Sequence, residues 1–328
     1  LENTSAILFI PDLVNYFLTG EKFNEYTIAS TSQLYNPVCN SWSTMIFKKL
    51  GLPEEAMQEI VFPGTVIGGL LKGIRDECDI HSDLAVMSVG SHDTASAVAA
   101  TPLLDENSVF LSSGTWSLLG MELDRPLINL NSLKENFTNE MGVGRRVRFL
   151  KNITGLWLIQ ECKRIWEREG KGLSYSDISK AANQAEAFKY RLDPDDPVFL
   201  NPENMPRTIR DYCQENNQTP PETIGEVARG IYESLAFSYK DVIEKIEKLL
   251  NKSVQNIHMV GGGIKAEILC QYTANISGRS VFAGPVEATA MGNIITQLIG
   301  SSEINSLEEG RTLVRNSIEL KEYLPGSN

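Results

Sequence analysis

The sequence has little of what metal cages and disulfide frameworks are made from. It contains three histidines and five cysteines in 328 residues, and the cysteines are scattered without any Cys-x-x-Cys pair. This composition disfavours a zinc site and a disulfide-stabilised fold. The simplest interpretation is a set of reduced thiols in a cytoplasmic protein.

Long apolar stretches are missing as well. No apolar run approaches the roughly 18 residues that a membrane span needs. Residues 6–18 are rich in apolar side chains, but Pro11 and Asp12 interrupt them and no cationic segment precedes them. They therefore do not have the pattern of a signal peptide, and we expect no membrane partner.

Positive charge is in deficit. Thirty Lys and Arg residues face 42 Asp and Glu residues, which gives a formal net charge of −12 and leaves no long basic run. Binding to nucleic acid or to an anionic membrane is therefore disfavoured. An anionic nucleotide would have to be held by local backbone amides, a metal ion and isolated lysines.

The length predicts more than one domain. A chain of 328 residues exceeds the size at which a single core usually stops growing. Hydrophobic residues make up 42% and charged residues 22%, which is ordinary for a globular protein. The polar break at 102–107 predicts a boundary between domains at 1–105 and 106–328.

One stretch places an acid at the end of an apolar run. Residues 85–89 are continuously apolar apart from Ser88, which predicts a strand covered on both faces. Gly90 ends this run, and Asp93 follows it with His92 beside it. A carboxylate in this position can orient a hydroxyl and accept its proton. A simple helix N-cap is the alternative interpretation.

A second apolar run starts about 20 residues later. Residues 109–113 and 115–121 predict a β-hairpin around Gly114, with Ser113 and Thr115 beside its tip. The amides and hydroxyls of such a tip can hold an anion, although an ordinary turn would have the same composition. An acid and an anion cradle at this separation together favour phosphoryl transfer.

A run of three glycines is the second candidate for nucleotide binding. Gly261-Gly262-Gly263 follows a predicted strand at 257–260 and precedes a predicted helix at 265–277. Glycines let a base or ribose lie directly on the backbone, although a tight turn can need them for steric reasons alone. The run matches neither the Walker loop nor the dinucleotide motif.

The remaining pattern alternates strands and helices. We expect the longest helix at 223–250, and further elements as follows: helices at 7–18, 42–50, 154–166 and 284–299, and strands at 146–150 and 280–283. Four prolines between 193 and 206 predict an extended loop. Its acidic residues do not form a calcium loop, because a mid-loop glycine is missing and prolines stand where ligands should be.

Several ordered blocks resemble a known family. His92-Asp93-Thr94-Ala95-Ser96-Ala97 and Ser112-Ser113-Gly114-Thr115-Trp116-Ser117 are similar to the FGGY family of sugar kinases and, within it, to the rhamnulokinases. The same resemblance continues in four more blocks: Ile10-Pro11-Asp12 to Leu18-Thr19-Gly20, Ala29-Ser30-Thr31-Ser32-Gln33-Leu34, Lys151-Asn152-Ile153-Thr154-Gly155-Leu156-Trp157 and Gly284-Pro285-Val286-Glu287-Ala288.

The resemblance implies an α/β, actin-like ATPase (ribonuclease H-like) fold of two lobes that close over a cleft. It implies ATP-dependent phosphorylation of L-rhamnulose to L-rhamnulose 1-phosphate, with ATP and Mg²⁺ as cofactors. Asp93 would be the general base and lie near the Mg²⁺, while His92 and Thr94 would contact the sugar. The residues that match nucleotide contacts are Ser113, Gly114, Thr115, Asn152, Gln160, Gly261, Gly262 and Gly263. Ala266 departs from the asparagine that rhamnulokinases often carry, which leaves the contact on the adenine side open.

The resemblance also implies an incomplete first lobe. The chain starts at Leu1, whereas rhamnulokinases carry a preceding segment that includes their first phosphate motif. We therefore expect this chain alone to be inactive, and its incomplete lobe to be covered by another chain or left poorly ordered. Alternative interpretations are a kinase for L-fuculose, D-xylulose or glycerol, and a nucleotide-binding module without catalysis.

Overall fold

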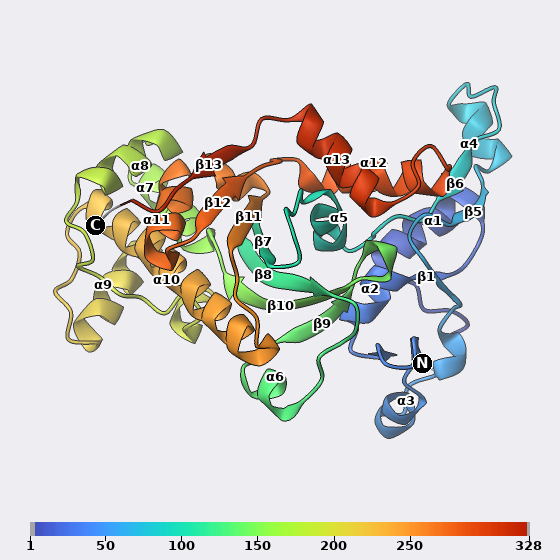
Figure 1. Cartoon of the computed structure of the whole chain (residues 1–328), viewed down its shortest axis with the longest axis horizontal. Coiled ribbons are helices and arrows are strands. Elements are labelled where there is room, and N and C mark those ends of the chain that lie inside the picture. The colour runs from blue at the N-terminus through green and yellow to red at the C-terminus, as the bar shows by residue number, and fades with distance from the viewer. Residues whose placement is uncertain (1–3, 327–328) are drawn as a thin grey trace.

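A seven-stranded mixed β-sheet forms the centre of the protein in the computed structural model, which describes residues 4–326 (Figure 1). Three strands in the middle are parallel: β7 (Ser108–Ser113), β11 (Asn256–Val260) and β12 (Ser280–Ala283). Antiparallel strands complete the sheet on both sides: β8 (Trp116–Leu123), β10 (Val147–Thr154) and β9 (Thr138–Met141) beyond β7, and β13 (Lys321–Tyr323) beyond β12. The predicted hairpin is confirmed, since β7 and β8 pair on either side of Gly114 and Thr115.

Helices cover one face of this sheet and contain most of the core. They are α7 (Trp157–Arg168), α8 (Tyr175–Gln184), α9 (Met205–Glu215), α10 (Ile224–Leu250) and α11 (Glu267–Ser277). Side chains alternate across a strand, so Val109 and Leu111 of β7 point into this layer. The long helix is confirmed: it begins after Thr223, whose hydroxyl accepts from the N–H of Glu226, and it ends at Asn251 in the left-handed conformation.

The opposite face packs against α5 (Asp93–Ala100), and α12 (Ala288–Gly300) and α13 (Leu307–Ser317) pack behind α5. Phe110 of β7, which points away from Leu111, contacts Val98 of α5. Helices α5 and α12 approach very closely, because a Cβ atom on Gly292 would lie 1.8 Å from the carbonyl oxygen of Ser96. Only glycine fits there, and this contact fixes the helix that begins with Asp93.

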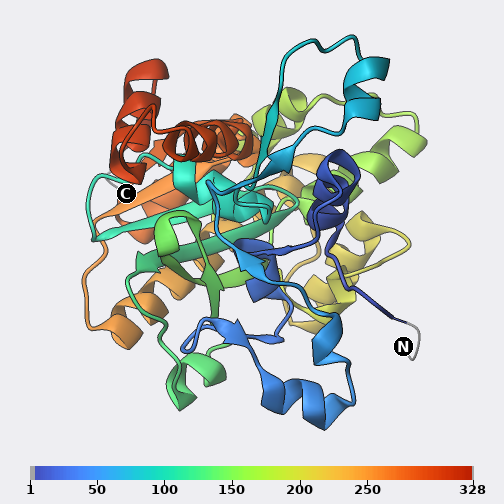
Figure 2. The same cartoon turned by 90° about the vertical axis from the view of Figure 1, so that its right-hand side faces the viewer.

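The N-terminal region is built from short elements and faces the viewer in Figure 2. Its helices are α1 (Ile10–Thr19), α2 (Tyr26–Thr31), α3 (Thr44–Leu50) and α4 (Lys72–Glu77). Its strands form three pairs: β1 (Asn24–Glu25) with β4 (Ile60–Val61), β2 (Tyr35–Asn36) with β3 (Ser41–Trp42), and β5 (Val66–Gly69) with β6 (Ala85–Met87). Tyr26 and Tyr35 pack on Met141 and Val147, which attaches α2 to the edge of the large sheet.

Short helical turns complete the chain. Helix α6 (Leu130–Lys134) joins β8 to β9, and 3₁₀ turns lie at Glu54–Ala56, Val143–Arg145, Pro197–Phe199 and Gly262–Lys265. Among residues 4–326, no helix combines the length and the apolarity needed to cross a membrane. All five cysteines are free; Cys162, Cys213 and Cys270 are buried, and Cys39 and Cys78 are exposed.

The prediction for 85–89 is wrong in one respect. Strand β6 is shorter than expected, and within the described residues it pairs only with β5, in an antiparallel manner. Ala85 is exposed and Val86 is half-buried, so this strand is not covered on both faces. A short apolar run alone does not distinguish a central strand from a strand at the margin of the molecule.

Several element boundaries also differ from the sequence prediction. Strand β10 continues to Thr154, so α7 begins only at Trp157, after the turn at Gly155. Helix α12 begins at Ala288 because the chain is irregular at Gly284 and Pro285 and forms a turn at Val286 and Glu287. The proline-rich segment at 193–206 is mostly irregular, as expected, but it includes the 3₁₀ turn and the first residues of α9.

A buried histidine lies in the middle of the sheet. His258 of β11 is fully buried, neither ring nitrogen has a hydrogen-bond partner among the described residues, and its ring stacks on Phe282 with centroids 5.2 Å apart. Burial lowers the pKa of His258 to about 4; Asp105 partly opposes this shift, and the charge of Arg311 adds to it. The folded protein therefore holds this ring neutral.

We predict that His258 makes the fold sensitive to acid. The unfolded chain binds a proton at the ordinary histidine pKa, so folding stability is intact above pH 6.5 and falls as the pH decreases toward 4. Between pH 7 and pH 4.5 the natural protein should lose about 2 to 3 kcal/mol more than His258→Leu in urea unfolding. His81→Leu, on an exposed side chain, is the control and should behave like the natural protein. Equal losses in all three proteins would show that His258 does not bind a proton on unfolding.

Candidate active site

Two adjoining cavities meet at the tip of the β7–β8 hairpin, and the larger one extends to the N-terminal region. The larger, about 1010 Å³, is lined by α2, the start of α5, the hairpin tip and strands β9 and β10. The smaller, about 640 Å³, lies between the hairpin tip, α7, α8 and the start of α11. They share Gly114, Thr115 and Gly262, so one continuous wall connects them.

The structure brings all the site residues named from the sequence to these walls. In the larger cavity are His92, Asp93, Thr94, Ser113, Asn152 and Gly261; in the smaller are Gln160 and Gly263; the three shared residues lie between them. The carboxylate and the hairpin tip, which are separated by a lobe boundary in the sequence, therefore face one common space.

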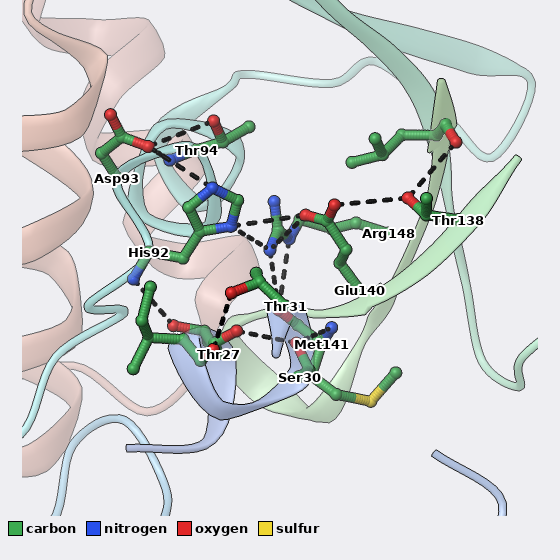
Figure 3. A network of polar contacts seen from close by, with 12 residues as sticks. Thr27, Ser30, Thr31, His92, Asp93, Thr94, Thr138, Glu140, Met141 and Arg148 are labelled. Carbon is green, nitrogen blue, oxygen red and sulfur yellow. Dashed lines mark hydrogen bonds and ion pairs between the residues drawn. The ribbon is translucent and has the colours of Figure 1, made fainter. Parts of the chain in front are cut away.

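Asp93 is the first residue of α5, and its two carboxylate oxygens have different surroundings. Oδ1 accepts from the backbone N–H of Thr94 at 2.6 Å and from the Thr94 hydroxyl at 3.3 Å, and it lies 3.6 Å from Nε2 of His92. No group in residues 4–326 hydrogen-bonds to Oδ2, and the side chain is 79% exposed. One oxygen is thus held in place while the other is available to a ligand (Figure 3).

His92 is held from behind by a buried ion pair (Figure 3). Its Nδ1 lies 2.9 Å from Nη2 of Arg148 and 3.3 Å from Oε2 of Glu140. Arg148 and Glu140 are themselves 3.2 Å apart, and the Arg148 side chain is completely buried. These two residues lie opposite each other on the paired strands β10 and β9.

The charges of this pair follow from its surroundings. Burial alone would raise the pKa of Glu140, but the contact with His92 and the charge of Arg148 outweigh it, so the pKa lies below its usual range. Arg148 also donates to the carbonyl oxygen of Met141 through Nε at 3.2 Å and Nη2 at 3.1 Å. The two residues therefore form an ionised pair inside the protein.

A second buried acid fixes the loop before Asp93. Glu25 accepts from the N–H groups of Thr27 and Ile28 at the start of α2, and also from the N–H of Ser91 at 3.2 Å. The Thr27 hydroxyl accepts from the N–H of His92 at 3.1 Å. Burial raises the pKa of Glu25 to about 7, although these hydrogen bonds oppose the shift. Helix α2 and the 90–92 loop are thereby joined.

The hairpin tip is fixed by the turn that precedes α7. The N–H groups of Gly155 and Leu156 donate to the carbonyl oxygens of Thr115 at 3.0 Å and Gly114 at 2.9 Å. A Cβ atom on Gly155 would lie 2.7 Å from the Gly114 oxygen and from the Ser117 hydroxyl. Only glycine at this position therefore lets the turn pack this closely against the hairpin tip. The Thr115 hydroxyl then donates to Oε1 of Gln160 at 3.1 Å.

The three glycines have different environments. A Cβ atom on Gly263 would lie 2.1 Å from the Ser113 hydroxyl, and one on Gly261, whose φ is +88°, would lie 2.9 Å from the Ser113 carbonyl oxygen. These two glycines allow the turn to pack on β7. A Cβ atom on Gly262 would meet nothing within 4 Å, so this residue faces open space shared by both cavities.

This packing buries the hydroxyl of Ser113, although the residue itself lines the larger cavity. The hydroxyl lies beneath Gly263 and has no hydrogen-bond partner among the described residues. The hydroxyl is buried because the turn at Gly261–Gly263 packs closely on the end of β7. The hairpin pattern in the sequence does not indicate this packing. The hydroxyl that remains at the tip is that of Thr115, which is exposed.

Sequence comparisons agree with this architecture. The family description "FGGY family of carbohydrate kinases" matches twice: its N-terminal domain over residues 1–99 and its C-terminal domain over residues 109–301. The chain belongs to the FGGY family of carbohydrate kinases. The two matches meet on either side of the polar break that the sequence shows near residue 105.

Among curated FGGY relatives, rhamnulokinases are strongly similar to the chain. The rhamnulokinase of Bacteroides thetaiotaomicron is 42% identical over 325 residues, covering 99% of this chain and 66% of that protein. The rhamnulokinase of Oceanobacillus iheyensis is 41% identical, over 98% of this chain and 67% of that protein. The rhamnulokinase of Bacillus subtilis is 38% identical, over 99% of this chain and 66% of that protein. The chain thus spans about two thirds of the length of these relatives.

Solved structures establish that the fold is the actin-like two-domain fold of FGGY kinases. A ligand-bound xylulose kinase from Lactobacillus acidophilus has a TM-score of 0.76 at 16% identity, over 98% of this chain and 64% of that one. Glycerol kinase from Plasmodium falciparum with ADP has a TM-score of 0.70 at 14% identity, over 95% and 61% of the two chains.

Three polar residues of this FGGY chain were not found by sequence reasoning: Glu25, Glu140 and Arg148. The alternation at 146–150 correctly predicts β10 but does not show that Arg148 points into the protein. The sequence offers one signal for Arg148: it is a charged residue in a predicted strand that continues toward Asn152. This position could have suggested that Arg148 lies near the site. Glu25 has no such signal, because its contacts with Ser91 join segments 66 positions apart.

We predict that Gly155→Ala displaces the hairpin tip. The added methyl group would overlap the Gly114 oxygen and the Ser117 hydroxyl, so the tip has to move, at a cost of about 1 to 3 kcal/mol. Hydrogen exchange should become faster in residues 114–117 and the urea midpoint should fall. Gly172→Ala, where a Cβ atom meets nothing within 4 Å, is the control. Unchanged exchange at the tip in Gly155→Ala would contradict the role given to this contact.

Proposed function

We propose that the protein transfers the γ-phosphoryl group of ATP to L-rhamnulose and forms L-rhamnulose 1-phosphate and ADP. The single observation that supports this reaction best is the shared cavity of Asp93 and the hairpin tip. A base and a phosphate-holding turn on one wall are what in-line transfer to a hydroxyl needs. The choice of L-rhamnulose rests on the rhamnulokinases, which are about 40% identical over nearly the whole chain.

ATP fits the two cavities in a defined order. The nucleoside would occupy the smaller one, against Gly262 and Gly263, with Gln160 and Asn152 toward its phosphates. The outer phosphates would lie at Gly114 and Thr115, which the cavities share, and with Gly261 they would be held mainly by amides and one hydroxyl. The open space over Gly262 is the structural support for this arrangement. Bound ADP in the similar glycerol kinase supports an adenine nucleotide.

The residues present are compatible with Mg²⁺ beside the phosphates. Mg²⁺ typically binds one or two carboxylates and completes its coordination with water and phosphate oxygens. The exposed side chain of Asp93 could supply such a carboxylate from the wall of the larger cavity. When bound, the ion would neutralise charge that develops on the transferred group.

The chain's own residues would then act on the sugar. Oδ2 of Asp93 accepts the proton of the primary hydroxyl as its oxygen bonds to the γ-phosphorus, and the bond from that phosphorus to the β,γ-bridging oxygen breaks to release ADP. His92 and Thr94, beside Asp93 on the same wall, would contact the sugar. The hairpin tip would keep the phosphates in line.

The sugar is the finer part of the proposal. Structural similarity to xylulose and glycerol kinases is weak in sequence, 16% and 14% identical, and supports the fold rather than their substrates. A panel of L-rhamnulose, L-fuculose, D-xylulose and glycerol, each followed by ADP release, separates these alternatives. The same assay on the 328 residues alone tests the expectation that they are inactive and act only as a nucleotide-binding module.

The organisation around this activity is proposed with it. We place the sugar-binding lobe at 1–105 and the nucleotide-binding lobe at 106–328, in a cytoplasmic enzyme. Helix α1 presents Ile10, Val14 and Phe17 to solvent, with exposures of 75%, 51% and 61%. Such an apolar stripe is normally covered, which supports contact of this lobe with further protein.

We predict that Asp93→Asn lowers turnover by about 10² to 10⁴, the range for loss of one general base. The amide cannot accept the proton, while α5 and the hairpin keep their positions. ADP release is measured in the longest form of the protein that shows sugar-dependent activity, and Asp76→Asn, on the exposed surface of α4, is the control. Turnover near that of the natural protein would rule out Asp93 as the base.

We predict that Gly262→Val weakens ADP binding at least about tenfold, because the side chain would fill the space over the turn. Thermal unfolding should change little, since a Cβ atom at this position contacts no protein group. Gly172→Val, also at an open position, should bind ADP normally. Isothermal titration with ADP measures both, and unchanged affinity in Gly262→Val would place the nucleotide elsewhere.

A further inference from the structure

The buried guanidinium behind His92 has a chemical property that the imidazole does not share. Arg148 can only donate hydrogen bonds, whereas each nitrogen of a neutral imidazole either donates or accepts. Nη2 of Arg148 lies 2.9 Å from Nδ1 of His92, the shortest polar contact that the ring makes. Nδ1 must therefore offer its lone pair to Arg148, which leaves the proton of the neutral ring on Nε2.

Glu140 lies beside the same ring nitrogen but forms no hydrogen bond with it. Its Oε2 lies 3.2 Å from Nη2 of Arg148 and 3.3 Å from Nδ1 of His92 without a hydrogen bond to either, and its Oε1 accepts from the Thr138 hydroxyl at 3.3 Å. Among the described residues, the aligned hydrogen bond at Nδ1 is therefore the one with Arg148. The negative charge of Glu140 compensates the buried guanidinium, which would otherwise be costly to enclose.

Arg148 is itself immobilised. It is fully buried, and two of its nitrogens donate to the Met141 carbonyl oxygen on the neighbouring strand. A donor that is held this firmly sets both the protonated nitrogen and the orientation of the ring in front of it. On the cavity side, Nε2 of His92 then faces Oδ1 of Asp93 at 3.6 Å, as Figure 3 shows.

We propose that Arg148 is a positioning residue that holds His92 as the neutral tautomer protonated at Nε2. In this tautomer the Nε2–H group faces Oδ1 of Asp93 from 3.6 Å, the oxygen to which Thr94 donates, so that Oδ2 remains available as the base. The tautomer follows from the contacts themselves, while its catalytic consequence rests on the proposed kinase function. Glu140 has the supporting part of neutralising Arg148.

The tautomer can be observed directly, because the chain has only three histidines. NMR of protein labelled with ¹⁵N and ¹³C in histidine distinguishes the two neutral tautomers by their ring shifts, and His81→Gln and His258→Leu assign the signals. At neutral pH the natural protein should show His92 protonated at Nε2. In Arg148→Met, the remaining partner of Nδ1 is the Glu140 carboxylate, which only accepts, so the proton should move to Nδ1.

A double variant tests whether the tautomer depends on the donor or acceptor character of the groups beside Nδ1. In Arg148→Met/Glu140→Gln both charges of the pair are removed, and the amide N–H of the new glutamine can donate to Nδ1. The Nε2 tautomer should therefore return. This variant also protects the test against a folding defect, since Arg148→Met alone leaves a buried carboxylate without its counter-ion.

Activity measurements connect the tautomer to catalysis. Arg148→Met should lower kcat about tenfold to hundredfold with little change in the KM for ATP, and the double variant should recover part of the loss. A natural protein with His92 protonated at Nδ1, or a tautomer that is unchanged in Arg148→Met, would overturn the proposal. If no sugar is phosphorylated by any form of the protein, the proposed function fails, and the tautomer result still decides the role of Arg148.

Discussion

The close packing of α5 against α12 is the constraint on which the site depends. Gly292 lets the two helices approach so closely that any side chain at this position would overlap the Ser96 carbonyl group. The contact is reinforced at both ends of α5. The Thr289 hydroxyl donates to the carbonyl oxygen of Asp93 at 3.3 Å. Arg311 donates to the carbonyl oxygen of Val98 at 3.0 Å, and it also forms an ion pair with Glu122 of β8. The candidate base is therefore placed by helix packing rather than by a flexible loop.

A second constraint is the burial of charge where the N-terminal region meets the sheet. Glu25, Glu140 and Arg148 are all buried, and each contacts polar groups of other elements, although Oε2 of Glu140 and Nη1 of Arg148 form no hydrogen bond within residues 4–326. Burying an ion pair rarely adds stability compared with apolar packing, because both charges lose their hydration. What such a pair provides is a fixed geometry, since removing either partner leaves the other uncompensated. Here that geometry fixes the 90–92 loop and the ring of His92.

The two cavities differ in the groups that line them. The larger cavity is lined by side chains with hydroxyl, amide, carboxylate and imidazole groups, whereas the smaller one combines glycines with polar side chains such as Gln160, Lys180 and Lys265. The glycines suit a protein with a net charge of −12, because backbone amides can hold phosphates without a cluster of basic side chains. The hairpin tip belongs to both cavities, and Gly155 fixes its position.

Sequence alone predicted the parts of this protein that depend on local pattern. The β7–β8 hairpin, the long helix after Thr223 and the strand before the three glycines follow from apolar periodicity and turn residues, and the FGGY resemblance follows from short ordered blocks. Most of the candidate site residues also lie in such blocks, which is why the structure finds them together. Where two patterns are locally alike, prediction failed: the apolar run at 85–89 is not a central strand.

Tertiary structure decided which polar groups face a ligand and which face the interior. Ser113 and Thr115 are both hydroxyl residues beside the hairpin tip, yet only the second has an exposed side chain, because the turn at Gly261–Gly263 covers the hydroxyl of the first. Arg148 appears in the sequence as one of two arginines in an alternating strand, and its role exists only because Glu140, His92 and Met141 converge on it. Periodicity determines the faces of an element, but the partner of each face is set by the packing of segments far apart in the chain.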